Sequence, residues 1–223
     1  MGGIRTGLLG GSFNPAHRTH RKISLAAVAA LGLDEVWWLV SPGNPLKAHA
    51  RDMAPLAARY GSALRMARRA PIRPTIIELD LRTRYTVDTL SRLVRRYPHR
   101  HFIWLMGSDN LEQFPQWRHW RRIARTVPIA VIVREGYDRR ARAVRAMGWL
   151  RRFVRPAGQA QEWTHWRLPA LVQLRFRPDP VSATRLRATN PGWHADYADK
   201  APRDRVTRRA LPMEDLCPVP PLP

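Results

Sequence analysis

The chain has 223 residues, of which 44% are hydrophobic and 25% are charged. These values predict a globular protein and exclude a wholly disordered or fibrous chain. The one cysteine, Cys217, lies in the last seven residues, which excludes a disulfide scaffold and a cysteine-rich zinc site. The net charge of +22 suits anionic ligands. Because the basic residues are spread along the chain without a basic arm, we do not expect nucleic acid as a partner.

Targeting signals are also lacking in the sequence. No apolar run approaches the roughly 20 residues of a membrane span, and the start of the chain does not read as a signal peptide. We therefore expect a cytoplasmic protein that has no membrane partner.

The first part of the chain alternates between short apolar runs and amphipathic stretches. Ile4–Leu9 reads as a buried strand that is closed by a turn rich in glycine and proline. The apolar spacing after it predicts a helix that ends at Gly32 with a left-handed cap. Val36–Val40 is the second predicted strand, and the second helix begins at Pro55 and ends at Pro71.

The same alternation continues along the chain. Four further strands are expected at Thr75–Leu79, His101–Met106, Ile129–Val133 and Leu171–Phe176. A helix capped by Thr86 separates the first two of these. The pattern predicts an α/β, Rossmann-like, doubly wound fold with a mainly parallel sheet covered by helices on both faces. Ligands of such sheets bind at the carboxyl ends of the strands.

The domain organisation follows from these elements. Residues 1–210 are expected to form a single domain, whose part from about residue 181 carries a phosphate-binding helix. Residues 211–223 form a proline-rich tail that we expect to be poorly ordered. The arginine-dense stretch Arg139–Arg155 reads as a solvated helix face.

The first segment with chemical character follows the first strand. Its glycines let backbone amides approach a ligand, and the start of the next helix favours an anion. His17 and His20 are one helical turn apart, so both can face the same phosphate. Seen alone, the segment fits a capped turn with two surface histidines equally well. The residues predicted to line the phosphate site are Gly10, Gly11, Ser12 and Phe13.

A second segment lies near the end of the chain. Ser182 and Thr184 place two hydroxyls at a helix start, and Arg187 follows one turn later. Together with the segment at residues 10–20, this closely resembles the nucleotidyltransferase superfamily, whose members carry HxGH and ISxTxxR motifs. Five further blocks, at residues 41–47, 85–89, 107–111, 114–120 and 134–137, are similar to those of bacterial nicotinate-nucleotide adenylyltransferases. The resemblance covers roughly residues 4–190.

The resemblance implies adenylyl transfer from ATP to nicotinate mononucleotide. His17, His20 and Arg187 would be the catalytic residues, and Lys47 is a weaker candidate for the ATP phosphates. Mg²⁺ would enter with ATP and would have few or no protein ligands, so no protein metal site is expected. We also expect that the chain can form a homo-oligomer.

The second substrate would be held by four residues. Trp117 would stack on the pyridine ring, the backbone near Thr86 would receive the carboxylate, Asp109 would bind ribose hydroxyls, and Arg134 would complete the set. Each has a structural alternative, since Trp117 can belong to the core and Thr86 can be only a helix cap. Three tryptophans in predicted strands are expected to serve packing alone: Trp37, Trp38 and Trp104.

One residue departs from the family's pattern. Thr19 stands where the HxGH motif has glycine, and a β-branched side chain there could crowd the bound phosphates unless the neighbouring backbone has adjusted. Two alternatives to the function therefore stay open. One is another mononucleotide adenylyltransferase, such as one that uses nicotinamide mononucleotide. The other is a non-catalytic, arginine-rich relative that binds nucleic acid.

Overall fold

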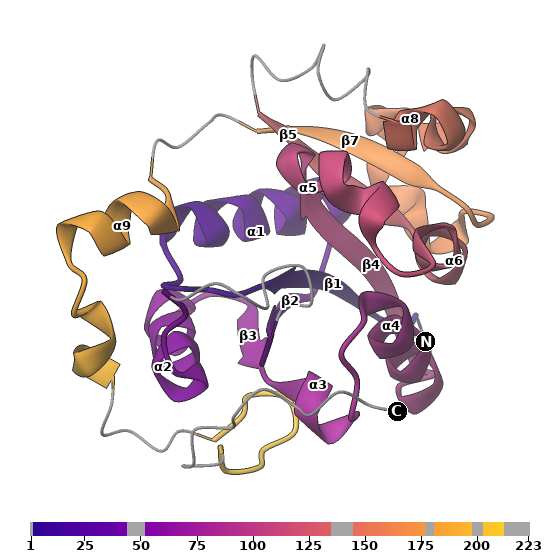
Figure 1. The fold of residues 1–223 in the computed structure, drawn as a ribbon. Helices are drawn as coiled ribbons and strands as arrows, with labels where there is room; N and C mark the ends of the chain where they lie inside the picture. The colour runs from indigo at the N-terminus through magenta and orange to yellow at the C-terminus, as the bar shows by residue number, and fades with distance from the viewer. Residues whose placement is uncertain (1, 44–51, 135–144, 177–180, 198–202, 212–223) are drawn as a thin grey trace.

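A computed structural model describes residues 2–43, 52–134, 145–176, 181–197 and 203–211. Its centre is a seven-stranded sheet in which each pair of neighbouring strands is parallel. Figure 1 shows this sheet crossing the molecule between two layers of helices. The strands are β1 (Ile4–Gly11), β2 (Glu35–Val40), β3 (Ile72–Thr75), β4 (Arg100–Gly107), β5 (Ile129–Arg134), β6 (Val154–Arg155) and β7 (Leu171–Phe176).

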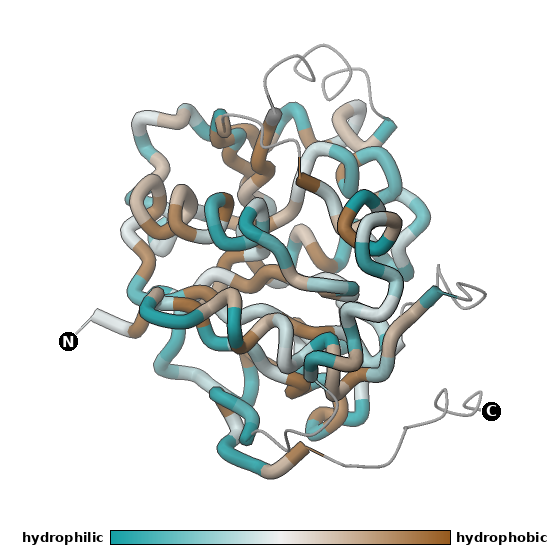
Figure 2. The backbone as a smooth tube through the Cα atoms, turned by 90° about the vertical axis from the view of Figure 1, so that its left-hand side faces the viewer, coloured by the Kyte–Doolittle hydropathy of each residue, from teal (hydrophilic) through white to brown (hydrophobic). Residues whose placement is uncertain are grey.

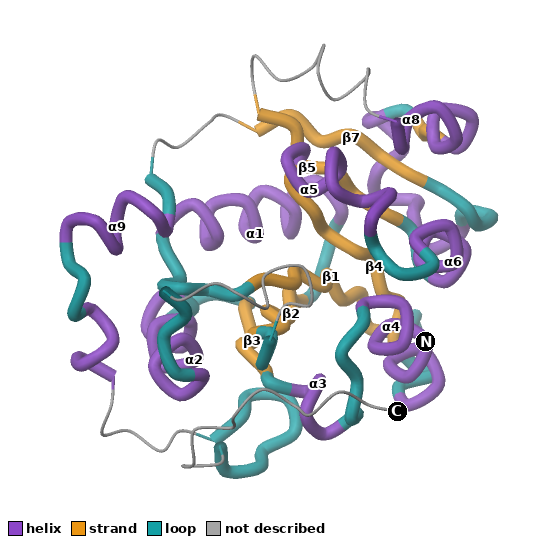
Figure 3. The backbone as a smooth tube through the Cα atoms, viewed as in Figure 1, coloured by secondary structure: helices purple, strands orange, loops and turns teal. Residues whose placement is uncertain are grey.

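The strand order is β3-β2-β1-β4-β5-β7-β6. Since β1 lies between β2 and β4, the chain winds first to one side of β1 and then to the other, which is the doubly wound arrangement. The strands form the inner layer in Figure 3 and the helices surround them. The predicted fold class is confirmed.

Helices and 3₁₀ turns cover the sheet. In the described residues no helix has the length and apolar character needed to cross a membrane. The α-helices are α1 (Arg18–Leu31), α2 (Leu56–Met66), α3 (Ile77–Asp80), α4 (Thr86–Arg96), α5 (Ser108–Gln113), α6 (Trp120–Thr126), α8 (Arg145–Leu150) and α9 (Ala183–Thr189). The 3₁₀ helices are η2 (Phe114–Gln116), η3 (Arg151–Phe153), η4 (Ala157–His165) and η5 (Trp193–Tyr197).

The sheet separates two hydrophobic cores. Along β2 successive side chains point to opposite faces, so Trp37 packs in one core with residues of α4, α5 and α6. Trp38 packs in the other core with residues of α1, α2 and η4. Figure 2 accordingly shows hydrophobic segments of the backbone passing through the interior of the molecule. Trp37, Trp38 and Trp104 are at most 3% exposed, which confirms that they are packing residues.

The predicted helix end at Gly32 is confirmed, and three other predicted helix boundaries differ from the structure. Gly32 ends α1 with φ 58° and ψ 47°, a left-handed conformation that favours glycine. Pro55 is the N-cap of α2 rather than its first helical residue, and α2 ends at Met66 rather than at Pro71. Likewise Tyr85 is the N-cap of α4, and Thr86 is its first residue.

The strand predicted at Thr75–Leu79 is wrong. The third strand, β3, is Ile72–Thr75, and the apolar residues after it form α3. Pro74 hid this strand, because proline cannot donate a ladder hydrogen bond. Here it is tolerated because β3 is the edge strand of the sheet. The two-residue strand β6 was too short to be found from the sequence.

The prediction of a solvated helix face at Arg139–Arg155 is only partly correct. The first six residues of this stretch lie outside the described part of the chain. The others form α8, η3 and β6 rather than one helix face. The arginines among them are exposed, as expected, whereas α8 buries Ala146, Met147 and Leu150.

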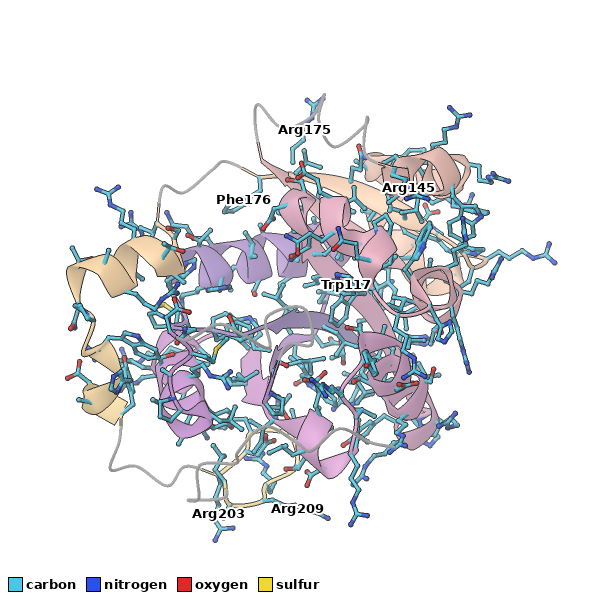
Figure 4. All side chains as sticks on the ribbon, viewed as in Figure 1. Trp117, Arg145, Arg175, Phe176, Arg203 and Arg209 are labelled. Atoms are coloured by element: carbon cyan, nitrogen blue, oxygen red, sulfur yellow. The ribbon has the colours of Figure 1, made fainter. Side chains whose placement is uncertain are left out.

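The end of the described chain is attached to β3. Asp204 is 1% exposed, and its carboxylate accepts hydrogen bonds from the Thr75 hydroxyl (3.0 Å) and the Ile76 amide (2.7 Å). Tyr60 donates to the carbonyl of Arg203, a residue labelled with Arg209 at the lower edge of Figure 4. Residues 203–211 therefore pack on the rest of the fold. The predicted tail lies beyond them, outside the described residues except for the buried Leu211.

Candidate active site

The predicted phosphate residues gather where the strands end. The loop after β1 leads into α1, and α9 lies beside the first turn of α1 in Figure 1. These segments thus lie at the carboxyl edge of a parallel sheet, the edge that binds ligands in doubly wound folds.

Two glycines at the end of β1 lie close to aromatic rings. A Cβ at Gly10 would lie 2.6 Å from the indole of Trp104, and one at Gly11 would lie 3.3 Å from the Phe13 ring. The first distance is too short for any side chain. Gly10 therefore lets the large β4 tryptophan pack across the end of β1.

The two histidines lie together at the start of α1. Their ring centroids are 3.9 Å apart, His17 is the N-cap of the helix and 8% exposed, and His20 is partly exposed. The His17 amide donates to Nδ1 of His20 (3.2 Å). Because Nδ1 accepts this hydrogen bond, a neutral His20 carries its proton on Nε2 and can donate it to a ligand.

Phe13 packs against the ring of His20. It is 1% exposed, stacks on Trp38 with a centroid distance of 5.1 Å and contacts the His20 ring at 4.9 Å. Its φ of 48° lies in the left-handed region, so the chain turns sharply here. Since the phenyl ring is buried, a contact between Phe13 and a phosphate would come from its backbone.

Arg187 reaches from α9 to the loop after β1. Its guanidinium donates to the carbonyl of Asn14 (2.7 Å) and pairs with the Asp52 carboxylate (2.7 Å). Asn14 also binds the backbone of Asp52 and Ala54 through its side-chain amide. Beside them lies a cavity of about 490 Å³ that both Thr184 and Arg187 line. The structure thus brings the second motif next to the first.

Thr19 makes a direct connection between the two motifs. It is 2% exposed, and its hydroxyl donates to the carbonyl of Val181 (3.0 Å). Ser182, the next residue, caps α9 by accepting a hydrogen bond from the Arg185 amide (3.3 Å). The neighbouring backbone has therefore accommodated the threonine.

Arg59 is a site residue that sequence reasoning missed. It is 2% exposed and donates to four carbonyl oxygens, those of Ala54, Ser12, Ser41 and Pro42. Burial lowers its pKa to about 10, so it stays charged at neutral pH. One buried arginine thus ties together the loops that follow β1 and β2.

The residues expected at the second substrate lie further along the same edge. Thr86 begins α4, where first-turn amides lack partners within the helix. Asp109, in the first turn of α5, folds its carboxylate back over Gly107, which leaves no room for a side chain at residue 107.

Trp117 is partly buried and lies against β4. Its ring makes edge contacts with Trp104 (6.1 Å) and Phe114 (5.5 Å), and the label in Figure 4 stands beside the β4 ribbon. Trp117 therefore packs on the core, which is the alternative role that the sequence left open for it, and part of its surface remains exposed.

A second missed group is the carboxyl of Glu78. Burial raises its pKa to about 7, although hydrogen bonds from the Thr89 and Ser41 hydroxyls act in the opposite direction. Thr89 donates to Oε1 at 3.1 Å. The carboxyl edge of the sheet therefore carries an acid that is partly neutral at physiological pH.

Three expectations are not settled by these contacts. Lys47 lies outside the described residues, and for Arg134 only the backbone, at the end of β5, is described. Within the described residues no three His, Cys, Asp or Glu side chains form a group that could hold a metal ion.

Known proteins resemble this chain along most of its length. The cytidylyltransferase-like family model matches residues 8–189. A probable nicotinate-nucleotide adenylyltransferase of Erythrobacter litoralis is 59% identical, over 93% of this chain and 94% of the relative. That of Parvibaculum lavamentivorans is 48% identical, over 86% and 94%.

A solved structure has the same fold. It is nicotinic acid mononucleotide adenylyltransferase of Plasmodium falciparum complexed with NaAD, with a TM-score of 0.59, 14% identity and 83% of each chain covered. The family match and the identity of the relatives together show that the chain belongs to the cytidylyltransferase-like family and, within it, to the nicotinate-nucleotide adenylyltransferases.

Proposed function

We propose that this protein transfers the adenylyl group of ATP to nicotinate mononucleotide, giving nicotinate adenine dinucleotide and pyrophosphate. The observation that carries the proposal is the meeting of two motifs 162 residues apart in the chain, joined by the hydrogen bond from Thr19 to Val181. The names of the relatives, at 59% and 48% identity, support this substrate pair.

In the proposed reaction a phosphate oxygen of nicotinate mononucleotide attacks the α-phosphorus of ATP. The bond from that phosphorus to the bridging oxygen breaks, and pyrophosphate leaves with the electron pair. The nucleophile is already ionised, so the protein contributes positioning and charge stabilisation rather than a general base.

The histidine pair acts on the ATP phosphates. His20, with Nδ1 accepting from the His17 amide, directs its Nε2 proton to a phosphoryl oxygen and stabilises the charge that develops at the α-phosphorus. The amides at the start of α1, beside Gly10, Gly11 and Ser12, favour the same anion.

Arg187 binds the leaving pyrophosphate. Its contact with the Asn14 carbonyl fixes the guanidinium, and Asp52 is 59% exposed, so that ion pair can exchange for a phosphate. Ser182, Thr184 and Lys47 would assist there. We propose that Mg²⁺ enters bound to ATP, where it neutralises phosphate charge, and that the protein supplies few ligands.

Nicotinate mononucleotide would be held by Thr86, Asp109, Trp117 and Arg134. Amides at the start of α4 receive the carboxylate, the exposed part of the Trp117 ring stacks on the pyridine, and Asp109 accepts from ribose hydroxyls. The second candidate substrate is nicotinamide mononucleotide, which has no carboxylate. A homo-oligomer stays a prediction.

The proposal is tested by identifying the products. Purified protein with ATP, Mg²⁺ and nicotinate mononucleotide should yield dinucleotide and pyrophosphate in equal amounts, measured by chromatography and a coupled pyrophosphate assay. Release of neither product, together with salt-dependent binding to nucleic acid, would contradict it and favour the non-catalytic alternative.

A further inference from the structure

Thr19 is the residue at which this chain departs from the motif of its family, and it is also the residue that joins the two phosphate motifs. We infer that Thr19 is a positioning residue, whose hydroxyl holds residues 181–187 against the histidine pair so that Arg187 and His20 act on one triphosphate. This inference rests on the proposed function.

The α9 segment needs such a contact because apolar packing holds it weakly. None of the seven residues of α9 is buried. A hollow of about 360 Å³ is lined by Arg18, at the start of α1, and by Val181 and residues of α9. Burial of its own side chains therefore cannot fix the position of this helix, and contacts at its two ends must do so.

Two sets of contacts hold the helix at its two ends. At the C-terminal end, Arg187 binds Asn14 and Asp52, and Trp193, just beyond the helix, is buried against Ala54 and Ala58. At the N-terminal end, the Thr19 hydroxyl donates a hydrogen bond to the Val181 carbonyl and so ties this end to the first motif.

The position of Thr19 makes the contact specific. Thr19 precedes His20 directly and is 2% exposed, while Val181 precedes the capping residue Ser182 directly. A shift of Val181 would therefore carry the α9 cap and Arg187 away from the histidines. Glycine has no hydroxyl and could not make this bond. The threonine thus contributes to the site instead of obstructing it.

Three variants test the inference. Thr19→Val has nearly the same shape but no hydroxyl, and it should raise the KM for ATP about fivefold, the effect of losing one hydrogen bond. The KM for nicotinate mononucleotide should change less than twofold, because that substrate lies along α4. Thr19→Ser restores the hydroxyl and should return the KM for ATP to within twofold of wild type, whereas Thr19→Gly should behave like Thr19→Val.

A second measurement does not depend on activity. Hydrogen exchange followed by mass spectrometry should show faster exchange of the amides of residues 183–189 in Thr19→Val than in wild type or Thr19→Ser. Circular dichroism serves as the control for folding. Unchanged exchange, an unchanged KM for ATP, or a Thr19→Ser variant that behaves like Thr19→Val would each overturn the inference. A wild-type protein without activity would refute the proposed function, and the exchange comparison alone would then decide whether Thr19 positions α9.

Discussion

The sheet has one edge where its parallel strands start and another where they end, and arginine side chains have different partners at these two edges. Where the strands start, buried Glu35 accepts from Arg100 (2.5 Å) and from the Trp37 indole (2.7 Å), and it also pairs with Arg73. Where the strands end, Arg59 donates to four backbone carbonyls.

This difference separates stability from ligand binding. At the strand starts one buried carboxylate, Glu35, pairs with both Arg73 and Arg100 and compensates part of their charge. Carbonyl dipoles hold Arg59 at the strand ends without cancelling its charge, and the acid Glu78 there has a raised pKa. Asp52 pairs with Arg187 at this edge but is exposed, so the strand ends keep positive charge that can meet phosphate and carboxylate groups. We expect substitutions at one edge to affect stability and those at the other to affect activity.

The largest effect is expected for Glu35→Ala. It removes the acceptor of the Trp37 indole and the carboxylate that pairs with Arg100, which then keeps the Thr6 hydroxyl as an acceptor. The free energy of unfolding should therefore fall by about 3 to 5 kcal/mol. Urea denaturation measures this loss. The turnover rate at a temperature where the variant stays folded should equal that of wild type, and a lower rate with unchanged stability would contradict the division between the edges.

His20→Ala tests the other edge. The turnover rate should fall by about 10² or more, because a donor to the developing charge is lost. The free energy of unfolding should change by less than about 1 kcal/mol. His165→Ala, which removes an exposed histidine in η4, is the matched control and should keep full activity. An active His20→Ala variant would refute the assignment.

Arg187→Lys keeps the charge but loses the planar group that binds Asn14 and Asp52 together. The value of kcat/KM for ATP should fall about 30-fold, since charge-assisted hydrogen bonds contribute about 2 kcal/mol. Steady-state kinetics measure this change. The control is Arg185→Lys, which changes an exposed arginine of the same helix. Equal kinetics in the two variants would place Arg187 outside the site.

Trp117→Ala should weaken nicotinate mononucleotide more than ATP. Stacking on a heteroaromatic ring is worth roughly 1 to 3 kcal/mol, so the KM for the mononucleotide should rise about tenfold. Because Trp117 also packs on Trp104 and Phe114, Trp117→Phe is needed as a control that keeps a ring. Equal weakening of both substrates would indicate a packing role alone.

The smallest effect concerns Glu78. Its folded-state pKa of about 7 lies above the unfolded value, so its contribution to stability is present at low pH and is lost as the pH rises through 7. Glu78→Gln removes this loss. The difference in unfolding free energy between the variant and wild type should grow by about 1 to 2 kcal/mol in favour of the variant as the pH rises from 5 to 8. A difference that does not change with pH would mean that this carboxyl is not buried from water.

Much of this fold follows from local sequence patterns. Apolar runs located β1, β2, β4, β5 and β7, because strands buried on both faces need continuous hydrophobic residues. The pattern failed at β3, where an edge strand accepts Pro74, and at β6, where two residues carry no pattern. Gly32 was found because a left-handed cap needs glycine.

The site could be predicted only as far as its motifs reach. His17, His20 and Arg187 belong to short motifs, and the structure brings these motifs together. Arg59 and Glu78 carry no such signal, since an arginine in a helix and an acid after a strand are usually exposed. Their roles depend on burial by segments distant in the sequence. Thr19 was recognised as a departure, but its partner Val181 is 162 residues away.

The most direct test of the proposed function is a comparison of two substrates in one assay. Initial rates of pyrophosphate release are measured with ATP, Mg²⁺ and either nicotinate or nicotinamide mononucleotide at equal concentration. Nicotinate mononucleotide should give the higher kcat/KM by at least about tenfold. Of the two substrates, only this one has a charged carboxylate that can bind the amides at the start of α4. A higher value for nicotinamide mononucleotide, or no pyrophosphate from either substrate, would contradict the proposal.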